Sequence, residues 1–115
     1  MSSEEKNSTI SVPVIALTEG SPFYKQYWDF EKRLRSFDLA TQDLFPSQSI
    51  MAKAGFFSTG ISDAVVCFYC GVCLNSWNKL DSPWLEHQVH SPDCAYLILN
   101  RHSVFQNVRN LLAQN

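Results

Sequence analysis

Apolar residues recur along this 115-residue chain with a helical period in some segments and in short extended runs in others. Residues 21–34 begin with Ser-Pro and then carry apolar side chains at i, i+4, i+7 and i+11, namely Phe23, Tyr27, Phe30 and Leu34. Proline is favoured at the first position of a helix, and this spacing places the four side chains on one face. The pattern predicts one helix with an aromatic face.

A second, shorter helix is expected over residues 47–54. Ser47 supplies a capping hydroxyl, and an apolar stripe follows at Ile50 and Met51. Gly55 then provides the left-handed residue that commonly ends a helix.

β-favouring residues follow this helix in two runs, at positions 56–58 and 64–68. The turn-forming segment 59–63 separates them, which predicts a hairpin. Residues 73–77 are expected to add a third strand. The fold class that this indicates is α+β.

The remainder of the chain returns to the helical period. Pro83 opens a helix that Ser-Pro at 91–92 ends, and residues 95–99 form a further helical segment. Residues 104–112 form the last one, which we expect Ser103 to cap.

Composition and length fit one globular domain rather than a disordered chain, because 45% of the residues are hydrophobic and 13% are aromatic. We interpret residues 1–20 as a flexible tail and residues 21–113 as the folding unit. The apolar stretch 12–17 within the tail is either a loose arm or a contact for a partner.

The amino terminus is acidic, so it does not resemble a signal peptide, and we expect neither a targeting nor a membrane-spanning segment. Four free thiols favour a reducing compartment, the cytosol or the nucleus. The net charge of −2 disfavours nucleic acid as a partner, because binding to phosphates needs positive charge.

Three cysteines and one histidine stand at metal-ligand spacing: Cys67, Cys70, His87 and Cys94 form C-x2-C-x16-H-x6-C. Thiolate and imidazole ligands suit Zn²⁺, and four of them close a tetrahedral site with no position left for substrate water. Such a metal holds the fold and does no chemistry. The alternatives are that the cysteines are buried apolar residues or a disulfide pair.

Other candidate ligands compete for these four places. Cys73 extends the run to C-x2-C-x2-C, and we assign it to packing. His87 and His90 lie on neighbouring faces of the expected helix, so spacing alone does not separate them. We expect His102 to face solvent.

Several segments share a pattern with a known family. They are Arg33-Leu34-Arg35-Ser36-Phe37, the run from Met51 to Gly60, Asp63, Cys67-Phe68-Tyr69-Cys70-Gly71, Leu74, Trp77, the run from Asp81 to His87, and Pro92-Asp93-Cys94. As a set, over about residues 30–100, they resemble the baculoviral inhibitor-of-apoptosis repeat, or BIR domain.

This resemblance implies a small zinc-stabilised fold with a three-stranded antiparallel sheet surrounded by short helices. It implies one structural Zn²⁺ held by Cys67, Cys70, His87 and Cys94. It also places Arg33 near that cluster, where its charge offsets the negative thiolates.

The resemblance further implies a groove for peptides that begin with a free alanine amine, as found in caspases and in antagonists of apoptosis inhibitors. By position, Asp81 and Glu86 bind the ammonium group, Trp77 forms the apolar wall, and Leu74 and Asn75 form the strand edge that pairs with the peptide. The alternatives are that Trp77 belongs to the core, that Asp81 is a cap at a helix start and that Glu86 is a solvated charge.

Two positions depart from the tightest peptide binders of the family. His90 stands where those members often have tryptophan, and Cys73 stands where glycine is frequent. His90 remains part of the predicted groove, and as a protonatable group it favours an acidic or phosphorylated second contact.

The function expected from this is a non-enzymatic interaction module that regulates apoptosis and caspases. The alternatives are a docking domain that binds a signalling adaptor through its helices, and a survivin-like reader of a histone amino terminus.

Overall fold

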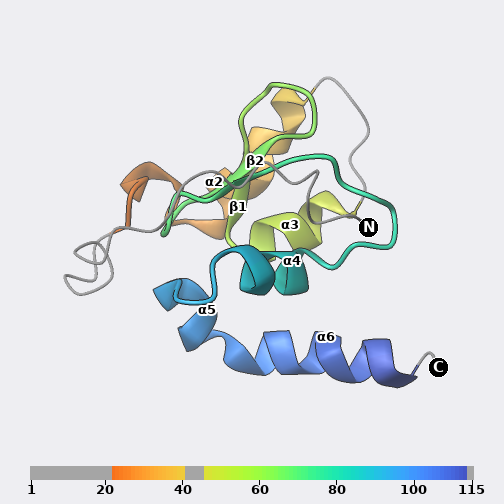
Figure 1. Ribbon diagram of the computed structural model, residues 1–115. Coiled ribbons are helices and arrows are strands. Elements are labelled where there is room, and N and C mark those ends of the chain that lie inside the picture. Colours follow the sequence, from red (N-terminus) through yellow and green to blue (C-terminus); the bar gives the residue numbers. More distant parts are fainter. Residues whose placement is uncertain (1–21, 41–45, 114–115) are drawn as a thin grey trace.

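The computed structural model describes residues 22–40 and 46–113, and the predicted tail lies outside them (Figure 1). A three-stranded antiparallel sheet lies at the centre, with β1 (Phe56–Ser58), β2 (Val65–Cys67) and β3 (Cys73–Leu74) in the order β1-β2-β3. Val66 pairs with Phe57 on one side and with Cys73 on the other. The expected α+β fold and the hairpin are therefore confirmed.

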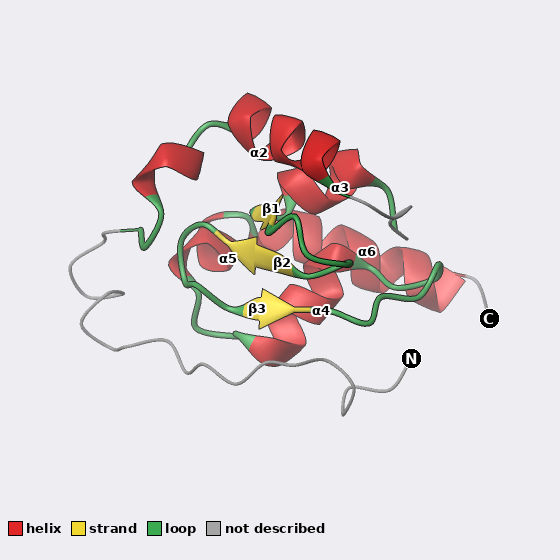
Figure 2. Ribbon diagram, turned by 90° about the horizontal axis from the view of Figure 1, so that it is seen from above, coloured by secondary structure: helices red, strands yellow, loops and turns green. Residues whose placement is uncertain are grey.

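Short helices surround the sheet, as Figure 2 shows. α2 and α3 pack against β1, and α4 packs against α3, α5 and α6. The helical segments are η2 (Lys25–Tyr27), α2 (Phe30–Ser36), η3 (Phe37–Leu39), α3 (Gln48–Lys53), α4 (Pro83–His90), α5 (Ala95–Leu99) and α6 (Arg101–Ala113). No helix within the described ranges combines the length and apolar character needed to cross a membrane.

Two of the predicted helices form largely for the reasons that the sequence indicates, except that Ser47 stands at the N-cap of α3 without a capping hydrogen bond from its hydroxyl. In α3, Met51 is fully buried, and Gly55 follows the helix with φ of +100°. In α4, Pro83 is the first residue, and the Ser82 hydroxyl accepts a hydrogen bond from the Leu85 N–H at 3.3 Å. Proline and a serine cap satisfy the start of the helix in the usual way.

The single helix expected over residues 21–34 is wrong, because the chain forms the turn η2 and then a separate helix α2. The N–H groups of Phe23 and Tyr24 donate to carbonyl oxygens of the turn that follows β2, at 3.1 and 2.9 Å. This pairing holds them outside a helix. Asp29 has extended backbone angles and caps α2 by accepting from the N–H two residues later.

Two other boundaries also differ from the prediction. The last helix begins at Arg101, so Ser103 lies inside it and does not cap it; the Ser103 N–H donates to the carbonyl of Asn100 at 2.9 Å. β3 ends at Leu74 and does not continue to Trp77, because Ser76 takes a positive φ of 63°.

Candidate metal centre and peptide groove

Four buried side chains from three parts of the fold meet at one point. The ligand atoms of Cys67, Cys70, His87 and Cys94 all lie within 4.8 Å of one another. The sulfurs of Cys67 and Cys94 are 4.0 Å apart, and Cys70 Sγ is 3.6 Å from His87 Nε2. β2 and its following turn supply the first two residues, α4 the third, and the N-cap position of α5 the fourth.

The turn after β2 directs backbone donors at the sulfurs, and the end of α4 adds a side-chain donor. Gly71 has φ of +80°, which a residue with a side chain rarely adopts. The N–H groups of Tyr69 and Cys70 point at Cys67 Sγ at 3.3 and 3.5 Å, and Ser91 Oγ donates to Cys70 Sγ at 3.2 Å. Such donors stabilise thiolates and orient them as ligands.

The orientation of the His87 ring identifies the nitrogen that faces the sulfurs. Nδ1 lies 2.8 Å from the carbonyl oxygen of Ala54, so Nδ1 carries the proton and donates it to that oxygen. Nε2 is then the nitrogen that faces the Cys70 sulfur. A ligating histidine commonly has a backbone partner of this kind. His87, not His90, therefore belongs to the cluster, which spacing alone did not decide.

The side chains of the cluster compete for protons. Burial raises the pKa of Cys67, whereas hydrogen bonds from Cys67 and Cys94 hold the pKa of Cys70 far below its usual range. Burial alone lowers the pKa of His87, but the thiolates beside it outweigh burial and raise it to about 9. A divalent cation removes this competition for protons, and three thiolates with one imidazole fit a tetrahedral zinc site.

Arg33 lies close to the cluster, as the resemblance implied. Its guanidinium carbon stands 4.7 Å from the centre of the Phe68 ring, and Nε donates to the carbonyl of Ala52 at 2.8 Å. Burial lowers the pKa of Arg33, and the nearby Cys67 acts in the opposite direction. The arginine is thus a buried cation beside a cluster of negative charge.

The strand edge predicted for the groove exists, but its residues contribute unequally. Within residues 22–40 and 46–113, β3 pairs only with β2, so in this part of the chain its other side is the edge of the sheet. Leu74 is fully buried and can offer a peptide only its backbone. Asn75 is half-buried and follows the strand. Trp77 is 7% exposed and packs edge-on against Phe56 with ring centres 5.9 Å apart.

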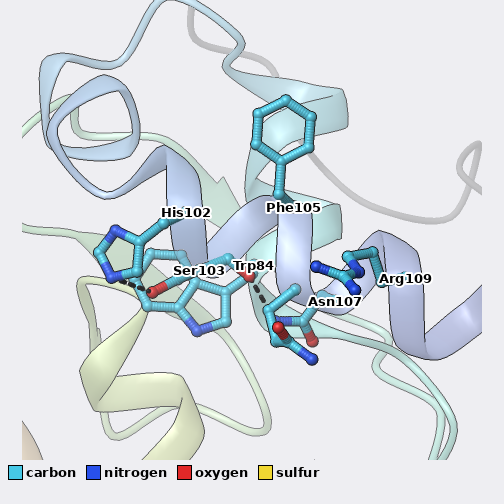
Figure 3. A pocket seen from close by; sticks show the side chains of 7 residues that line it. Trp84, His102, Ser103, Phe105, Asn107 and Arg109 are labelled. Carbon is cyan, nitrogen blue, oxygen red and sulfur yellow. Dashed lines mark hydrogen bonds between the residues drawn. The ribbon is translucent and has the colours of Figure 1, made fainter.

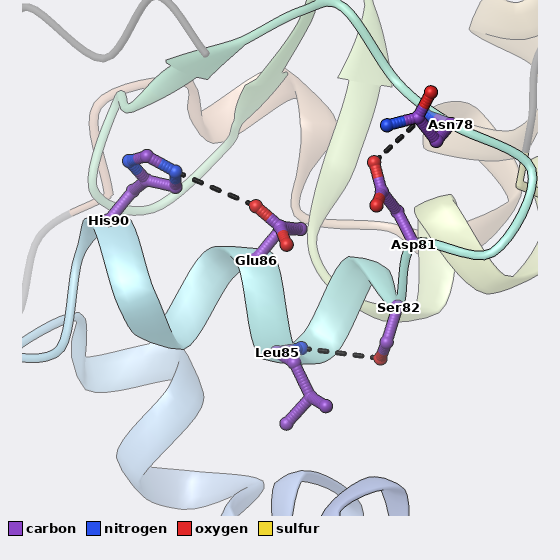
Figure 4. Close-up of polar contacts among 6 residues, drawn as sticks. All are labelled: Asn78, Asp81, Ser82, Leu85, Glu86 and His90. Carbon is purple, nitrogen blue, oxygen red and sulfur yellow. Dashed lines mark hydrogen bonds and ion pairs between the residues drawn. The ribbon is translucent and has the colours of Figure 1, made fainter. Parts of the chain in front are cut away.

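Figure 4 shows the side chains of Asp81, Glu86 and His90 on one side of α4 and of the residues just before it, opposite the side chains of Ser82 and Leu85. Asp81 does not cap the helix; its carboxylate accepts a hydrogen bond from the N–H of Asn78 at 2.8 Å. Glu86 is only 5% exposed, so it is not a solvated charge, and it lies 3.6 Å from His90 Nε2. The fold therefore gathers these side chains, and their binding of a peptide stays a prediction.

Two features were missed by sequence reasoning. The Asp63 carboxylate accepts hydrogen bonds from the N–H groups of Ser76 and Trp77, and no local pattern signals a bond across thirteen residues. A cavity of about 610 Å³ lies beside α6, and none of its lining residues belongs to the cluster or to the predicted groove (Figure 3). Its lining includes Trp84 and Arg109.

A zinc-type Cys3His cluster that joins a small antiparallel sheet to short helices defines a class of compact interaction modules. The profile of the family described as "BIR: Inhibitor of Apoptosis domain" matches residues 33–98, more than half of the chain. The chain therefore belongs to the BIR family of inhibitor-of-apoptosis proteins. A BIR domain is a protein-interaction module and not a catalytic one.

Individual relatives agree with this assignment. The putative apoptosis inhibitor ORF99 of Ostreid herpesvirus 1 is 44% identical over 68 residues, which cover 59% of this chain and 27% of the viral protein. The E3 ubiquitin-protein ligase XIAP of Xenopus tropicalis is 41% identical over 80 residues, or 69% of this chain and 16% of that protein. The chain thus spans only about a quarter or less of the length of these relatives.

Solved structures share the fold. The autoinhibited dIAP1-BIR1 domain and DIAP1 BIR1 bound to a Grim peptide each have a TM-score of 0.54 and 38% identity to this chain. Each match covers 59% of this chain and 69% of the other.

Proposed function

We propose that this chain is a zinc-stabilised BIR module that binds peptides with a free amino-terminal alanine, such as those of caspases or of antagonists of apoptosis inhibitors. In this function one Zn²⁺, held by Cys67, Cys70, His87 and Cys94, would supply four bonds that tie the sheet to α4 and α5. The peptide would lie along β3 and place its ammonium group beside Asp81 and Glu86.

One observation carries this proposal: among the described residues β3 pairs on one side only, with β2, and two poorly exposed carboxylates follow it in the chain. The backbone of β3 can pair with an extended peptide, and this supplies affinity without regard to sequence. Asp81 and Glu86 are 8% and 5% exposed, so their charge is poorly screened by water. A cation bound there gains more than it would at an open surface. The Grim peptide bound to DIAP1 BIR1 supports the binding of a peptide by this chain.

His90 influences which peptide is accepted. Its ring lies 3.6 Å from Glu86, and a protonated His90 would share the negative charge that the ammonium group needs. Because a histidine also offers a smaller apolar face than tryptophan, we propose weaker binding to purely apolar second residues than to acidic ones.

Titration with an Ala-initiated tetrapeptide, and with the same peptide acetylated at its amine, tests the proposal. Glu86→Gln keeps the shape of the side chain but removes its charge, and we expect a loss of about 1.5 to 3 kcal/mol in binding free energy. Asp81→Asn is preferable to Asp81→Ala, because the amide oxygen can still accept from Asn78. Equal affinity for the free and acetylated peptides would refute recognition of the amine.

A second candidate, docking of a signalling adaptor to the helices, is favoured by exposed apolar side chains on two of them. Phe105, Leu111 and Leu112 of α6 are each more than half exposed, and Trp28 is 64% exposed after η2. Contiguous exposed apolar surface marks interaction sites. Phe105→Ser should abolish adaptor binding and leave peptide binding intact, whereas the reverse result would exclude this candidate.

A further inference from the structure

We propose that Asp63, in the loop between β1 and β2, is a positioning residue for the peptide groove: it ends β3 and sets the chain that carries Trp77. This inference rests on the proposed function for its effect on binding. Its structural part, that the Asp63 carboxylate fixes Ser76 and Trp77, can be tested without any peptide.

The contact is a carboxylate that accepts from two consecutive backbone amides. Oδ1 of Asp63 is 3.0 Å from the nitrogen of Ser76, and Oδ2 is 2.8 Å from the nitrogen of Trp77. Hydrogen bonds to an ionised acceptor are shorter and stronger than those between neutral groups. Two such bonds on adjacent residues fix both the position and the direction of the chain.

The register of the sheet shows that these two hydrogen bonds replace a backbone pairing between strands. Val65 pairs with Leu74, so an uninterrupted antiparallel ladder would place residue 63 opposite residue 76 as a backbone partner. The side chain of Asp63 takes that place instead, and Ser76 turns into the left-handed region with φ of 63°. A serine in that region needs surrounding contacts to hold it there.

The turn at Ser76 directs the next side chain into the fold. Trp77 packs edge-on against Phe56, whose ring in turn lies 4.7 Å from that of His87 in the cluster. The N–H of Asn78 then donates to the Asp81 carboxylate, and the Asp81 N–H donates to the carbonyl of Asn78 at 3.1 Å. Both the predicted wall and one predicted ammonium ligand thus follow from the direction that the chain takes at residue 76.

Asp63 can do this because its own loop is well held. The N–H of Thr59 donates to the carbonyl of Ala64 at 3.1 Å, and the Thr59 hydroxyl donates to the same oxygen at 2.9 Å. The hydroxyl also accepts from the N–H of Ile61 at 3.1 Å. The hairpin loop therefore presents Asp63 from a fixed backbone.

The chemistry of the contact ranks the substitutions. Asparagine keeps the length of the side chain, but only one of its two terminal atoms accepts a hydrogen bond, so one of the two amides loses its bond. Alanine removes both bonds. Asp38→Ala is the control, because Asp38 is exposed on η3 and its removal changes the net charge by the same amount.

The experiment compares the zinc-loaded wild type with Asp63→Ala, Asp63→Asn and Asp38→Ala. Two-dimensional ¹H–¹⁵N spectra and hydrogen exchange of the Ser76 and Trp77 amides are recorded without peptide, and an Ala-initiated tetrapeptide is then titrated. We expect faster exchange and shifted resonances at both amides, with affinity reduced at least tenfold in Asp63→Ala and less in Asp63→Asn. Asp38→Ala should match the wild type in both measurements.

The two claims fail separately. Unchanged Ser76 and Trp77 amides in Asp63→Ala, or affinity within twofold of the wild type, would overturn the positioning role. If the wild type binds no peptide at millimolar concentration, the proposed function fails, and the amide spectra still decide whether Asp63 fixes the turn. If Asp63→Ala does not fold around zinc, Asp63→Asn provides the same readouts.

Discussion

At the scale of single residues, the Arg33 side chain donates hydrogen bonds to three backbone carbonyls. Its Nε donates to Ala52 O at 2.8 Å, and its Nη1 donates to the carbonyls of Tyr27 and Trp28 at 3.0 and 2.9 Å. One guanidinium thus joins η2 and α2 to α3. Arginine suits this role because its planar fork presents donors in several directions at once.

Replacing Arg33 by alanine should therefore destabilise the zinc-loaded protein by about 3 kcal/mol, because buried carbonyls that lose a partner cost about 1 to 3 kcal/mol each. Arg35→Ala, an exposed position two residues later on the same helix, is the control and should change stability by less than about 0.5 kcal/mol. Urea unfolding at fixed zinc concentration measures both. Equal midpoints for the two variants would contradict the role of Arg33.

At the scale of elements, the sequence predicted what depends on neighbours along the chain. The hairpin, the proline start of α4 and the glycine end of α3 follow from local turn and cap rules, and the spacing of the metal ligands follows from the same turns. The helix expected over residues 21–34 failed because Phe23 and Tyr24 pair with a turn more than forty residues away. The spacing of apolar residues along the chain gives no signal for contacts between such distant segments.

The same distinction applies to the candidate site. Cys67, Cys70 and Cys94 could be chosen from spacing, but His87 was separated from His90 by the family resemblance and by its place beside the Cys70 sulfur, not by spacing. Asp63 was not found as a positioning residue for a similar reason, since its partners Ser76 and Trp77 lie beyond the end of β3, more than ten residues along the chain. The sequence pattern gives no signal for hydrogen bonds that side chains make to residues distant along the chain.

Two glycines with nearly the same backbone angle provide a test of how the turn after β2 is packed. Gly71 and Gly60 have φ of +80° and +81°. A Cβ at Gly71 would lie 2.3 Å from Cδ2 of Phe23, whereas a Cβ at Gly60 would have no described atom beyond its chain neighbours within 4 Å. Gly60→Ala should cost about 1 to 2 kcal/mol from the left-handed backbone alone. Gly71→Ala should cost clearly more, because the Phe23 ring must leave its place.

A double-mutant cycle separates these two contributions. In the Phe23→Ala background the clash is absent, so the cost of Gly71→Ala should fall to that of Gly60→Ala. Urea unfolding of the four proteins of the cycle gives the coupling directly. A cost that is the same with and without Phe23 would show that the backbone angle, and not the packed ring, makes Gly71 necessary.

At the scale of the whole molecule, the Cys3His cluster lies between the sheet and the carboxyl-terminal helices. β2 and its turn provide two ligands, and α4 and α5 provide the others, so a bound ion would link the sheet to the carboxyl-terminal helices. The sheet strands are only two or three residues long. A domain of this size has only a small free energy of unfolding without a metal. In small zinc modules, metal binding supplies on the order of 10 kcal/mol.

Stability should therefore follow the free zinc concentration. A tenfold decrease in buffered free zinc should lower the free energy of unfolding by about 1.4 kcal/mol as long as the site is saturated, and a strong chelator should unfold the protein.

Cys94→Ser should abolish this dependence together with the fold, because one of the four ligands is lost. Cys73→Ser is the matched control, because Cys73 lies outside the cluster and is only partly buried. Far-ultraviolet circular dichroism across the zinc series measures the outcome. If Cys94→Ser stays folded and its stability falls with decreasing zinc as that of the wild type does, the ion is held elsewhere.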